Sequence, residues 1–241
     1  MSTTNYAIND PVHGVMRLSS DEASAIRAII DTPPFQRLRR IKQLGLGHLV
    51  YPGAVHTRFN HMLGTGFITK KIIEQLVQCS DDFKAIEEKR HDFKLTAIIT
   101  GLLHDVGHGP YSHAFELVNF LHKDKRINED KDTVFIAHED WSVPIIDKII
   151  TELKVNNNDE SAKTLFNSIE LSGKILAKKY VENEKYEAEI IGKLISSQLD
   201  ADRMDYLLRD SHFCGVDYGA YSIEWLIHCI DYKNDLGKQQ F

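Results

Sequence analysis

The sequence predicts an all-α, mostly helical protein with a short N-terminal β-hairpin or arm. Apolar residues recur at helical spacing along most of the chain, and strand signals are confined to its start. Residues 95–106 are apolar nearly all round, which is typical of a helix at the centre of a core. We expect a single domain over residues 1–241, with an arm at 1–18, a helical core at 19–230 and a tail at 231–241.

The arm is predicted from residues 8–18, which read INDPVHGVMRL. Asp10-Pro11 and His13-Gly14 are turn signals, and a short apolar alternation follows them. The apolar side chains of this arm need a cover, and they are Ile8, Val12 and Val15. We therefore expect a homo-oligomer, a dimer or larger.

The helical pattern begins after the arm. Ser19 and Glu22 form a capping box for a helix that ends near Asp31. Thr32 caps a second helix with Pro33 in its first turn, where a missing N–H is tolerated. The buried stripe of this second helix is Phe35, Leu38 and Ile41.

Further along the chain, residues 51–64 lead into a helix that continues to Ile72 and Leu76, and the apolar helix at 95–106 stops at a glycine-rich turn. Helices are also expected at 139–153, 187–209 and 221–230, and solvated loops at 122–132 and 154–160.

Composition excludes several classes of protein. The chain has 29 Lys and Arg against 35 Asp and Glu, a net charge of −6, which disfavours nucleic-acid binding. A nucleic-acid-binding or scaffold protein stays open as an alternative through one local basic patch, Arg37, Arg39, Arg40, Lys42 and Arg58. Three widely spaced cysteines indicate neither a disulfide framework nor a zinc knuckle. No apolar run approaches the roughly 18 residues of a membrane span, and the first ten residues are too polar for a signal peptide, so we expect a cytoplasmic protein without a membrane partner.

The first sign of chemistry is the His104-Asp105 pair at the end of the buried apolar helix. A buried aspartate needs a partner, because removing its charge from water costs roughly several kcal/mol. Imidazole and carboxylate together suit a divalent cation, although a His-Asp pair that only bonds to backbone is the alternative. Two adjacent residues cannot enclose an ion, so other ligands must come from elsewhere in the chain.

A second sign is the run LDADRMDYLLRD at 199–210. Asp202, Tyr206 and Asp210 are spaced i, i+4 and i+8, so they share one face of a helix. The alternative is a salt-bridged surface face. We accept that alternative for Asp205 and Arg209, which pair at i+4, and reject it for Asp202.

Four blocks, PGAVHTRFNHMLG, GLLHDVGHGPYSHAFE, HEDWSV and DADRMDYLLRD, occur in this order. Together they resemble the HD-domain metal-dependent phosphohydrolases, and within them the deoxynucleoside triphosphate triphosphohydrolases and related bacterial HD phosphohydrolases. The resemblance runs from residue 8 to about residue 230. It implies a helical HD core and hydrolysis of a deoxynucleoside triphosphate (dNTP) to deoxynucleoside and inorganic triphosphate. A nucleotide monophosphatase or phosphodiesterase of HD type is the alternative.

The resemblance also implies four groups of site residues. One divalent metal ion (Mn, Fe, Mg, Ni or Zn, which these residue types do not distinguish) is bound by His61, His104, Asp105 and Asp202. The reaction centre is lined by His108, His113 and His138, with Glu116 orienting His113. The nucleotide is contacted at its phosphates by Arg58 and Arg203, at its sugar edge by Tyr206 and Asp210, and at the deoxyribose by Gln43 and Leu44. In regulated relatives an activating nucleotide binds between subunits, at positions that match Asn9, Asp31, Gln36 and Arg39.

The other histidines are expected to be ordinary core or surface residues, and these are His13, His48, His91, His122, His212 and His228. His56 is expected to shape the loop beside the site. Regulated relatives continue well beyond the equivalent of Ile230, so we expect part of the pocket wall to be lacking here or to come from another subunit.

Overall fold

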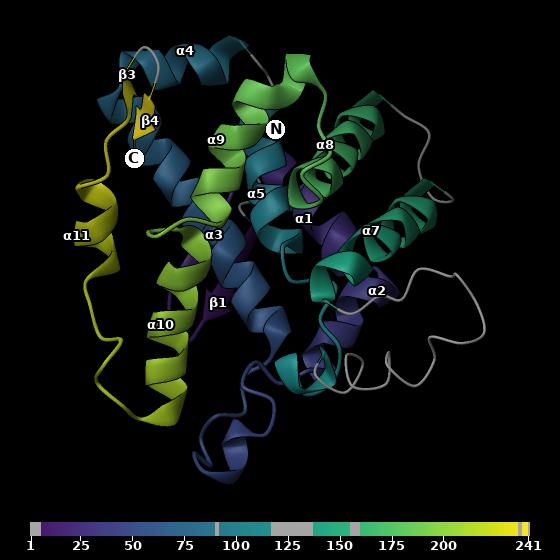
Figure 1. The fold of residues 1–241 in the computed structure, drawn as a ribbon, viewed down its shortest axis with the longest axis vertical. Helices are drawn as coiled ribbons and strands as arrows, with labels where there is room; N and C mark the ends of the chain where they lie inside the picture. The colour runs from purple at the N-terminus through teal and green to yellow at the C-terminus, as the bar shows by residue number, and fades with distance from the viewer. Residues whose placement is uncertain (1–5, 90–91, 117–136, 155–159, 236–237, 241) are drawn as a thin grey trace, which may run out of the picture.

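The computed structural model describes residues 6–89, 92–116, 137–154, 160–235 and 238–240, and it is helical apart from short hairpins, as predicted (Figure 1). The helices are α1 (Ser20–Ile30), α2 (Pro33–Gln36), α3 (Arg58–Cys79), α4 (Asp81–Lys89), α5 (Phe93–Leu103), α7 (His138–Lys154), α8 (Glu160–Leu176), α9 (Lys185–Ile195), α10 (Ala201–Cys214) and α11 (Ile223–His228). Short 3-10 turns are η1 (Arg37–Arg40), η2 (Gly47–Leu49) and η3 (Glu182–Glu184). The strands are β1 (Tyr6–Asp10), β2 (Gly14–Leu18), β3 (Lys233–Asp235) and β4 (Lys238–Gln240). None of the described helices combines the length and the apolar composition needed to cross a bilayer.

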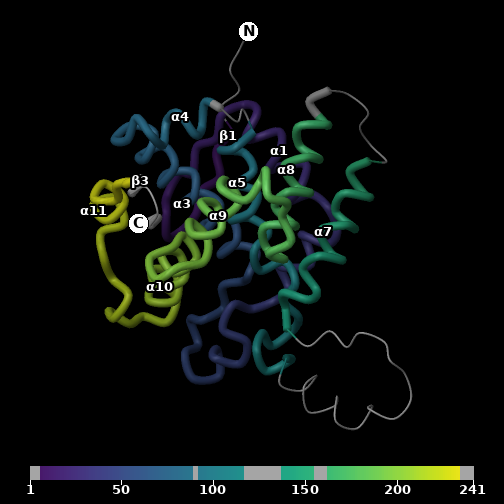
Figure 2. Tube along the Cα trace, turned by 45° about the horizontal axis from the view of Figure 1, so that its top comes forward, coloured from purple at the N-terminus to yellow at the C-terminus, as the bar shows by residue number. Residues whose placement is uncertain are grey.

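Helices α3 and α5 pack side by side in the middle of the molecule (Figure 1). Helix α10 packs on α3, and α8 packs on α5 with α7 beyond it, so the two flanks lie on opposite sides of the central pair (Figure 2). One buried cluster joins the N-terminal hairpin, α1, α3, α5 and α7, and a second joins α3, α4, α9, α10 and α11. Helix α3 belongs to both clusters: its first turns pack in the first cluster and its later turns in the second, so the helix is fixed along its length.

The N-terminal hairpin packs on its own chain. Strands β1 and β2 are antiparallel, with Asp10 opposite Gly14. Met16 and Leu18 are buried in the first cluster and Ile8 packs against it, whereas Val15 is 52% exposed. The core of the same chain therefore covers most of the arm, and the prediction that a second subunit is needed to cover it is wrong.

The predicted capping box is confirmed. Glu22 donates its N–H to Oγ of Ser19 at 3.4 Å, and Ser19 donates its N–H to the Glu22 carboxylate at 2.9 Å. Thr32 does not cap α2 with its side chain; its hydroxyl instead donates to the carbonyl of Ile29 at 2.7 Å. The second helix is accordingly short and continues as a 3-10 turn, and its predicted stripe is buried: Phe35, Leu38 and Ile41.

The prediction of a single long helix at 187–209 is wrong, because two helices occupy this range. Helix α9 ends at Ile195, and α10 starts only after Asp200. The Asp200 carboxylate accepts the backbone N–H of Ser197 at 2.6 Å and of Arg203 at 2.7 Å, so this aspartate caps α10 and ends the loop before it. Helices α4 and α8 were not predicted from the sequence. The loop expected at 122–132 and most of the one at 154–160 lie outside the described residues.

Candidate metal and catalytic site

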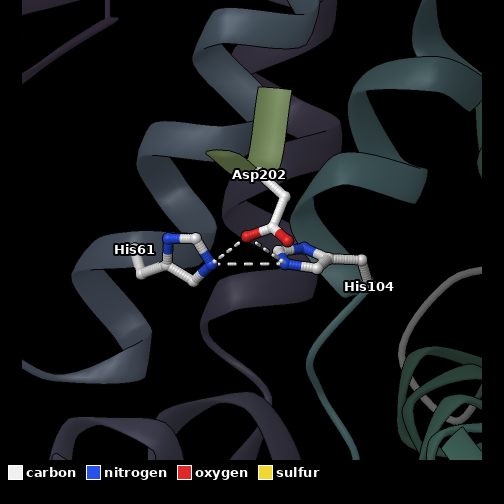
Figure 3. Close-up of side chains that lie close together, drawn as sticks. All are labelled: His61, His104 and Asp202. Carbon is white, nitrogen blue, oxygen red and sulfur yellow. Dashed lines mark hydrogen bonds and ion pairs between the residues drawn. The ribbon is translucent and has the colours of Figure 1, made fainter. Parts of the chain in front are cut away.

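Two histidines from different helices face each other in the interior. His61 lies in the first turn of α3 with its side chain fully buried, and His104 follows the last residue of α5. Their Nε2 atoms are 3.3 Å apart. Asp202, in the first turn of α10, places its Oδ1 3.1 Å from Nε2 of His61 and 3.6 Å from Nε2 of His104. The three side chains point toward one another and form a group, named here the metal group, that could hold an ion (Figure 3).

The other nitrogen of each ring already has a partner. Nδ1 of His61 is 2.8 Å from Oδ2 of Asp205, and Nδ1 of His104 is 2.7 Å from the carbonyl oxygen of Gly101. Carboxylate and carbonyl oxygens only accept hydrogen bonds, so each Nδ1 carries a hydrogen. In neutral rings both Nε2 lone pairs then face each other and the carboxylate of Asp202, which is unfavourable unless a cation lies among them. This set of two imidazoles and a carboxylate fits a divalent metal ion.

The electrostatics of the metal group also favour a positive charge between the rings. Burial on its own would lower the pKa of His61, but hydrogen bonds to Asp202 and Asp205 outweigh burial and raise the pKa to about 9. Burial would likewise lower the pKa of His104, and the nearby aspartates raise it instead. Burial would raise the pKa of Asp202, whereas the two histidines hold it well below its usual range.

Asp105 joins the metal group to a second set of histidines. Its Oδ2 lies 3.6 Å from Nε2 of His104 and 3.8 Å from Nε2 of His61. Its Oδ1 lies 3.5 Å from Nε2 of His108 and 3.7 Å from Nε2 of His138. Burial would raise the pKa of Asp105, but the surrounding histidines and an arginine hold it well below its usual range. The structure thus brings together all four side chains that the resemblance implies as metal ligands.

The second set consists of three histidines around one glutamate. The rings of His108 and His138 stack with their centroids 3.8 Å apart. His138 donates from Nδ1 to Glu116 at 2.7 Å, and His113 donates from Nδ1 to the other oxygen of Glu116 at 3.0 Å. The side chain of His113 is 74% exposed, whereas His108 is buried, and burial lowers the pKa of His108 to about 2. Glu116 therefore contacts His113 as expected, and it also holds His138.

A cleft of about 530 Å³ opens onto the metal group and onto one histidine of the second set. Its lining includes His104 and Asp202 of the metal group, the adjacent Asp105, and His138. Other parts of the wall come from the end of α8 and from α9. A ligand that enters this cleft would therefore meet the metal group directly.

Comparison with known families agrees with this geometry. A family model described as "HD domain" matches residues 58–210, which is more than half of the chain. The chain belongs to the HD-domain family. The matched range begins at the first residue of α3 and ends within α10, so it contains every residue of the metal group and Asp105.

Relatives of this HD-domain protein are longer than the chain. The uncharacterized protein YwfO of Bacillus subtilis is 35% identical over 226 residues, which cover 94% of this chain and 44% of YwfO. Human deoxynucleoside triphosphate triphosphohydrolase SAMHD1 is 32% identical over 228 residues, covering 88% of this chain and 34% of SAMHD1. A crystal structure of a hypothetical protein from Aquifex aeolicus matches with a TM-score of 0.66 and 32% identity, covering 95% of this chain and 52% of that one. The chain spans less than half the length of these two curated relatives.

Two of the residues expected at the nucleotide, Arg58 and Gln43, are linked to Asp105 by hydrogen bonds, Gln43 through Ser112 and Arg58. Arg58 is buried and donates hydrogen bonds to Asp105 and, from Nη2 at 2.8 Å, to Oγ of Ser112. That hydroxyl donates in turn to the carbonyl oxygen of Gln43 at 3.2 Å. Among the described residues, the side-chain Oε1 of Gln43 is buried without a hydrogen-bond partner. Leu44 follows it and is half-buried.

The remaining nucleotide residues are spread along α10. Arg203 has a half-exposed side chain and donates from Nε to the carbonyl oxygen of Ser197 at 3.1 Å. Tyr206 is half-buried, and Asp210 is buried and accepts a hydrogen bond from Nε2 of His56 at 2.8 Å. His56 thereby ties the loop before α3 to α10, as expected of a residue that shapes that loop.

The residues expected at a regulatory nucleotide are placed as follows. Arg39 donates from Nε to Oε1 of Gln36 at 2.8 Å, and its guanidinium lies over the ring of Phe59 at 3.6 Å. Gln36 donates to the carbonyl of the last residue of α1, and Asp31 is the next residue. Asn9 is exposed on β1 opposite Val15. The structure thus brings three of these four residues to one end of α1.

The pairing of Asp205 with Arg209 is confirmed, but its expected place on the surface is wrong. Both side chains are fully buried, and Nε of Arg209 donates to Asp205 at 2.8 Å. Asp10 and His13 of the hairpin contact the same pair, and His61 completes the set, named here the buried ion-pair network. The i, i+4 spacing predicted the pair, but no local signal indicated that a hairpin would cover it.

Proposed function

We propose that this HD-domain protein hydrolyses dNTPs to deoxynucleoside and inorganic triphosphate in a metal-dependent reaction. The observation that carries the proposal is the metal group with Asp105, next to three histidines and open to a cleft. Similarity to proteins named deoxynucleoside triphosphate triphosphohydrolase, such as human SAMHD1, supports the substrate class. That substrate is the finer part of the proposal, because relatives of slightly higher identity carry no named activity.

In this proposal His61, His104, Asp105 and Asp202 hold one divalent ion. When bound, such an ion polarises a phosphoryl oxygen and lowers the pKa of coordinated water. The two aspartates are held ionised, so they offset the two charges of the ion and leave the site receptive to a phosphate. Arg203, with its half-exposed side chain, would bind the phosphates, and Arg58 would do so with the guanidinium hydrogens that its bonds to Asp105 and Ser112 leave over.

Among the histidines, His113 is best placed to protonate the leaving oxygen. Its side chain is exposed toward solvent and its Nδ1 is held by Glu116, which leaves Nε2 to carry the transferred proton. His108 is buried and, because of burial, has a pKa of about 2, so its ring is neutral near pH 7. His138 is also held by Glu116, but its Nε2 lies 3.7 Å from Asp105. We therefore assign His108 and His138 to binding and orientation, and the acid to His113.

The sugar would lie near the other end of the site. The buried Oε1 of Gln43 needs a hydrogen-bond donor, and a sugar hydroxyl supplies one. Leu44 would pack against the deoxyribose, and Tyr206 and Asp210 would contact the sugar edge from α10. Asp210 already pairs with His56, so it would act within that pair.

We also propose self-association and a regulatory nucleotide, bound by Asn9, Asp31, Gln36 and Arg39 between subunits. The support is that Asp31, Gln36 and Arg39 lie together at one end of α1. Sedimentation at micromolar concentration, with and without added GTP, measures both. We expect a dimer or a larger oligomer. A monomer under both conditions would contradict the two proposals.

The experiment for the main proposal is product analysis. Purified protein is incubated with each of the four dNTPs and with Mn²⁺, Mg²⁺, Fe²⁺, Ni²⁺ or Zn²⁺ in turn, and the products are separated by ion-exchange chromatography. Inorganic triphosphate together with deoxynucleoside is the expected result, and the variant Asp202→Ala should yield neither. Parallel incubations contain nucleoside monophosphates or a phosphodiester, and release of orthophosphate or cleavage of the diester there, without triphosphate from dNTPs, would favour the alternative HD activities.

A further inference from the structure

The turn of the N-terminal hairpin is clamped onto α10. The Asp10 carboxylate accepts the backbone N–H groups of Val12 at 2.9 Å and His13 at 3.1 Å, which fixes the turn from within. The same carboxylate accepts hydrogen bonds from Nη1 of Arg209 at 3.0 Å and Nη2 at 3.3 Å. Asp10 is 4% exposed and Arg209 is fully buried, so water does not compete for these bonds.

The Asp205 carboxylate receives four hydrogen bonds at once. Arg209 donates to both of its oxygens at 2.8 Å. His13 donates from Nε2 to Oδ1 at 2.6 Å, and His61 donates from Nδ1 to Oδ2 at 2.8 Å. Each oxygen therefore accepts two bonds, and the carboxylate is held in one orientation. Of these donors, His13 is the one that comes from the hairpin.

This arrangement links the hairpin to a metal ligand. Oδ2 of Asp205 fixes Nδ1 of His61, and with it the direction in which Nε2 faces Asp202 and His104. Carboxylates behind a ligating histidine orient the ring and raise its basicity, and their loss typically weakens metal binding about 10- to 100-fold. We propose that Asp10 and His13 are positioning residues of the metal site, so that the N-terminal hairpin sets the affinity for the metal ion. This inference rests on the metal-binding part of the proposed function.

The competing explanation is that the network only anchors the hairpin to the core. An anchor would change the free energy of unfolding and leave the metal affinity of the folded protein unaltered. A positioning role changes the affinity itself, and it is restored by a side chain that can replace the hydrogen bond. The two explanations therefore differ in a measurement on folded protein.

The test is titration calorimetry of the full chain with Mn²⁺ at pH 8, alongside thermal unfolding of each metal-free variant. We expect His13→Ala to weaken Mn²⁺ binding by about 10-fold, the lower end of that range, because His13 acts on His61 through Asp205. His13→Gln, whose amide can donate to Oδ1 of Asp205, should recover most of that loss. Arg17→Ala is the matched control, because Arg17 is exposed on β2 of the same hairpin. The Mn²⁺ affinity of the Arg17→Ala variant should equal that of the unsubstituted protein.

Unaltered affinity in folded His13→Ala would overturn the inference, as would a loss that His13→Gln does not relieve. If His13→Ala does not fold, Asp10→Asn takes its place, since it keeps the shape of the side chain and removes the charge that holds Arg209. Unaltered Mn²⁺ affinity in that variant overturns the inference equally. Protein that binds Mn²⁺ but leaves dNTPs intact would contradict the proposed substrate and not the role of the hairpin.

Discussion

His61 holds a proton in the place where a metal ion would bind. Its pKa is raised to about 9 by Asp202 and Asp205, so near pH 7 the ring is doubly protonated and a metal ion must displace a proton from Nε2. Below the raised pKa, metal binding therefore competes with protons. We expect the association constant for Mn²⁺ to rise by about tenfold per pH unit between pH 7 and 8.5, for one proton released.

Calorimetry in buffers with different ionisation enthalpies measures that proton directly, since the heat then depends on the buffer. His48→Ala is a suitable control, because His48 is bonded to the carbonyl of Gly45 away from the metal group. An affinity that stays constant over this pH range, with no proton released, would contradict the assigned role of His61.

Asp105 and Asp202 should differ in what their loss does to stability. Asp202 has a third of its side chain exposed, whereas Asp105 is the carboxylate that offsets the buried charge of Arg58. Both Asp105→Ala and Asp202→Ala should abolish Mn²⁺ binding. Only Asp105→Ala should also lower the free energy of unfolding strongly, by about 3–5 kcal/mol, because it leaves a buried cation unpaired.

Urea unfolding of the metal-free variants measures this difference. The double variant Arg58→Met, Asp105→Ala is the control, and it should regain part of the loss since no unpaired charge remains. Equal destabilisation by the two single changes would show that Arg58 finds another partner.

Among the helices, the sequence predicted correctly those features that depend on residues close together in the chain. The capping box at Ser19 and the buried stripe that starts at Phe35 depend on neighbours within a few residues, and both are present. The break between α9 and α10 depends on Asp200 binding two backbone N–H groups, and aspartate occurs equally well on helix surfaces. The helical period across this region therefore predicted one helix where two exist.

The same difference between local and long-range contacts explains which parts of the candidate site could be predicted. The residues of the metal group could be predicted because their motifs occur in a fixed order, and the structure brings them together. The place of Asp205 could not be predicted, because its burial depends on Asp10 and His13 far away in the chain. A charged pair at i, i+4 is most often solvated, and only the packed hairpin makes this one part of the interior.

Helix α3 packs so closely against the buried ion-pair network that position 64 has room only for glycine. A Cβ atom at Gly64 would lie 1.8 Å from Oδ1 of Asp205, which is far inside contact distance. We expect Gly64→Ala to lower the free energy of unfolding by at least about 1–3 kcal/mol, as overpacking does, and to weaken Mn²⁺ binding by displacing Asp205.

Gly173→Ala is the matched control. Its Cβ would lie 3.4 Å from the side chain of Ile146, an ordinary contact, inside helix α8. This change should be neutral or stabilising by up to about 1 kcal/mol, since alanine favours helix. Thermal unfolding and Mn²⁺ titration of both variants compare the two sites, and a Gly64→Ala protein with unaltered stability would contradict the packing described here.

For the whole molecule, the distribution of charge decides between an enzyme and a nucleic-acid-binding protein. The basic patch expected from the sequence does not form as a unit. Arg58 is buried against Asp105, and Arg37 donates to the carbonyl oxygens of Val106 and His108. Two of the five predicted cations therefore stabilise the turn that carries the HD pair.

Binding of nucleic acid depends on cations that reach phosphates and release counterions. With a net charge of −6 and this patch divided, we expect binding to a labelled 20-base-pair duplex or to single-stranded DNA no tighter than about 10⁻⁵ M at physiological salt, the level of non-specific contact. Fluorescence anisotropy measures the affinity, and a salt titration measures the number of phosphates contacted. Asp202→Ala should bind DNA equally weakly, because its side chain serves the metal group. Nanomolar binding that weakens steeply with salt and persists in Asp202→Ala would instead show a second surface function, separate from the metal site.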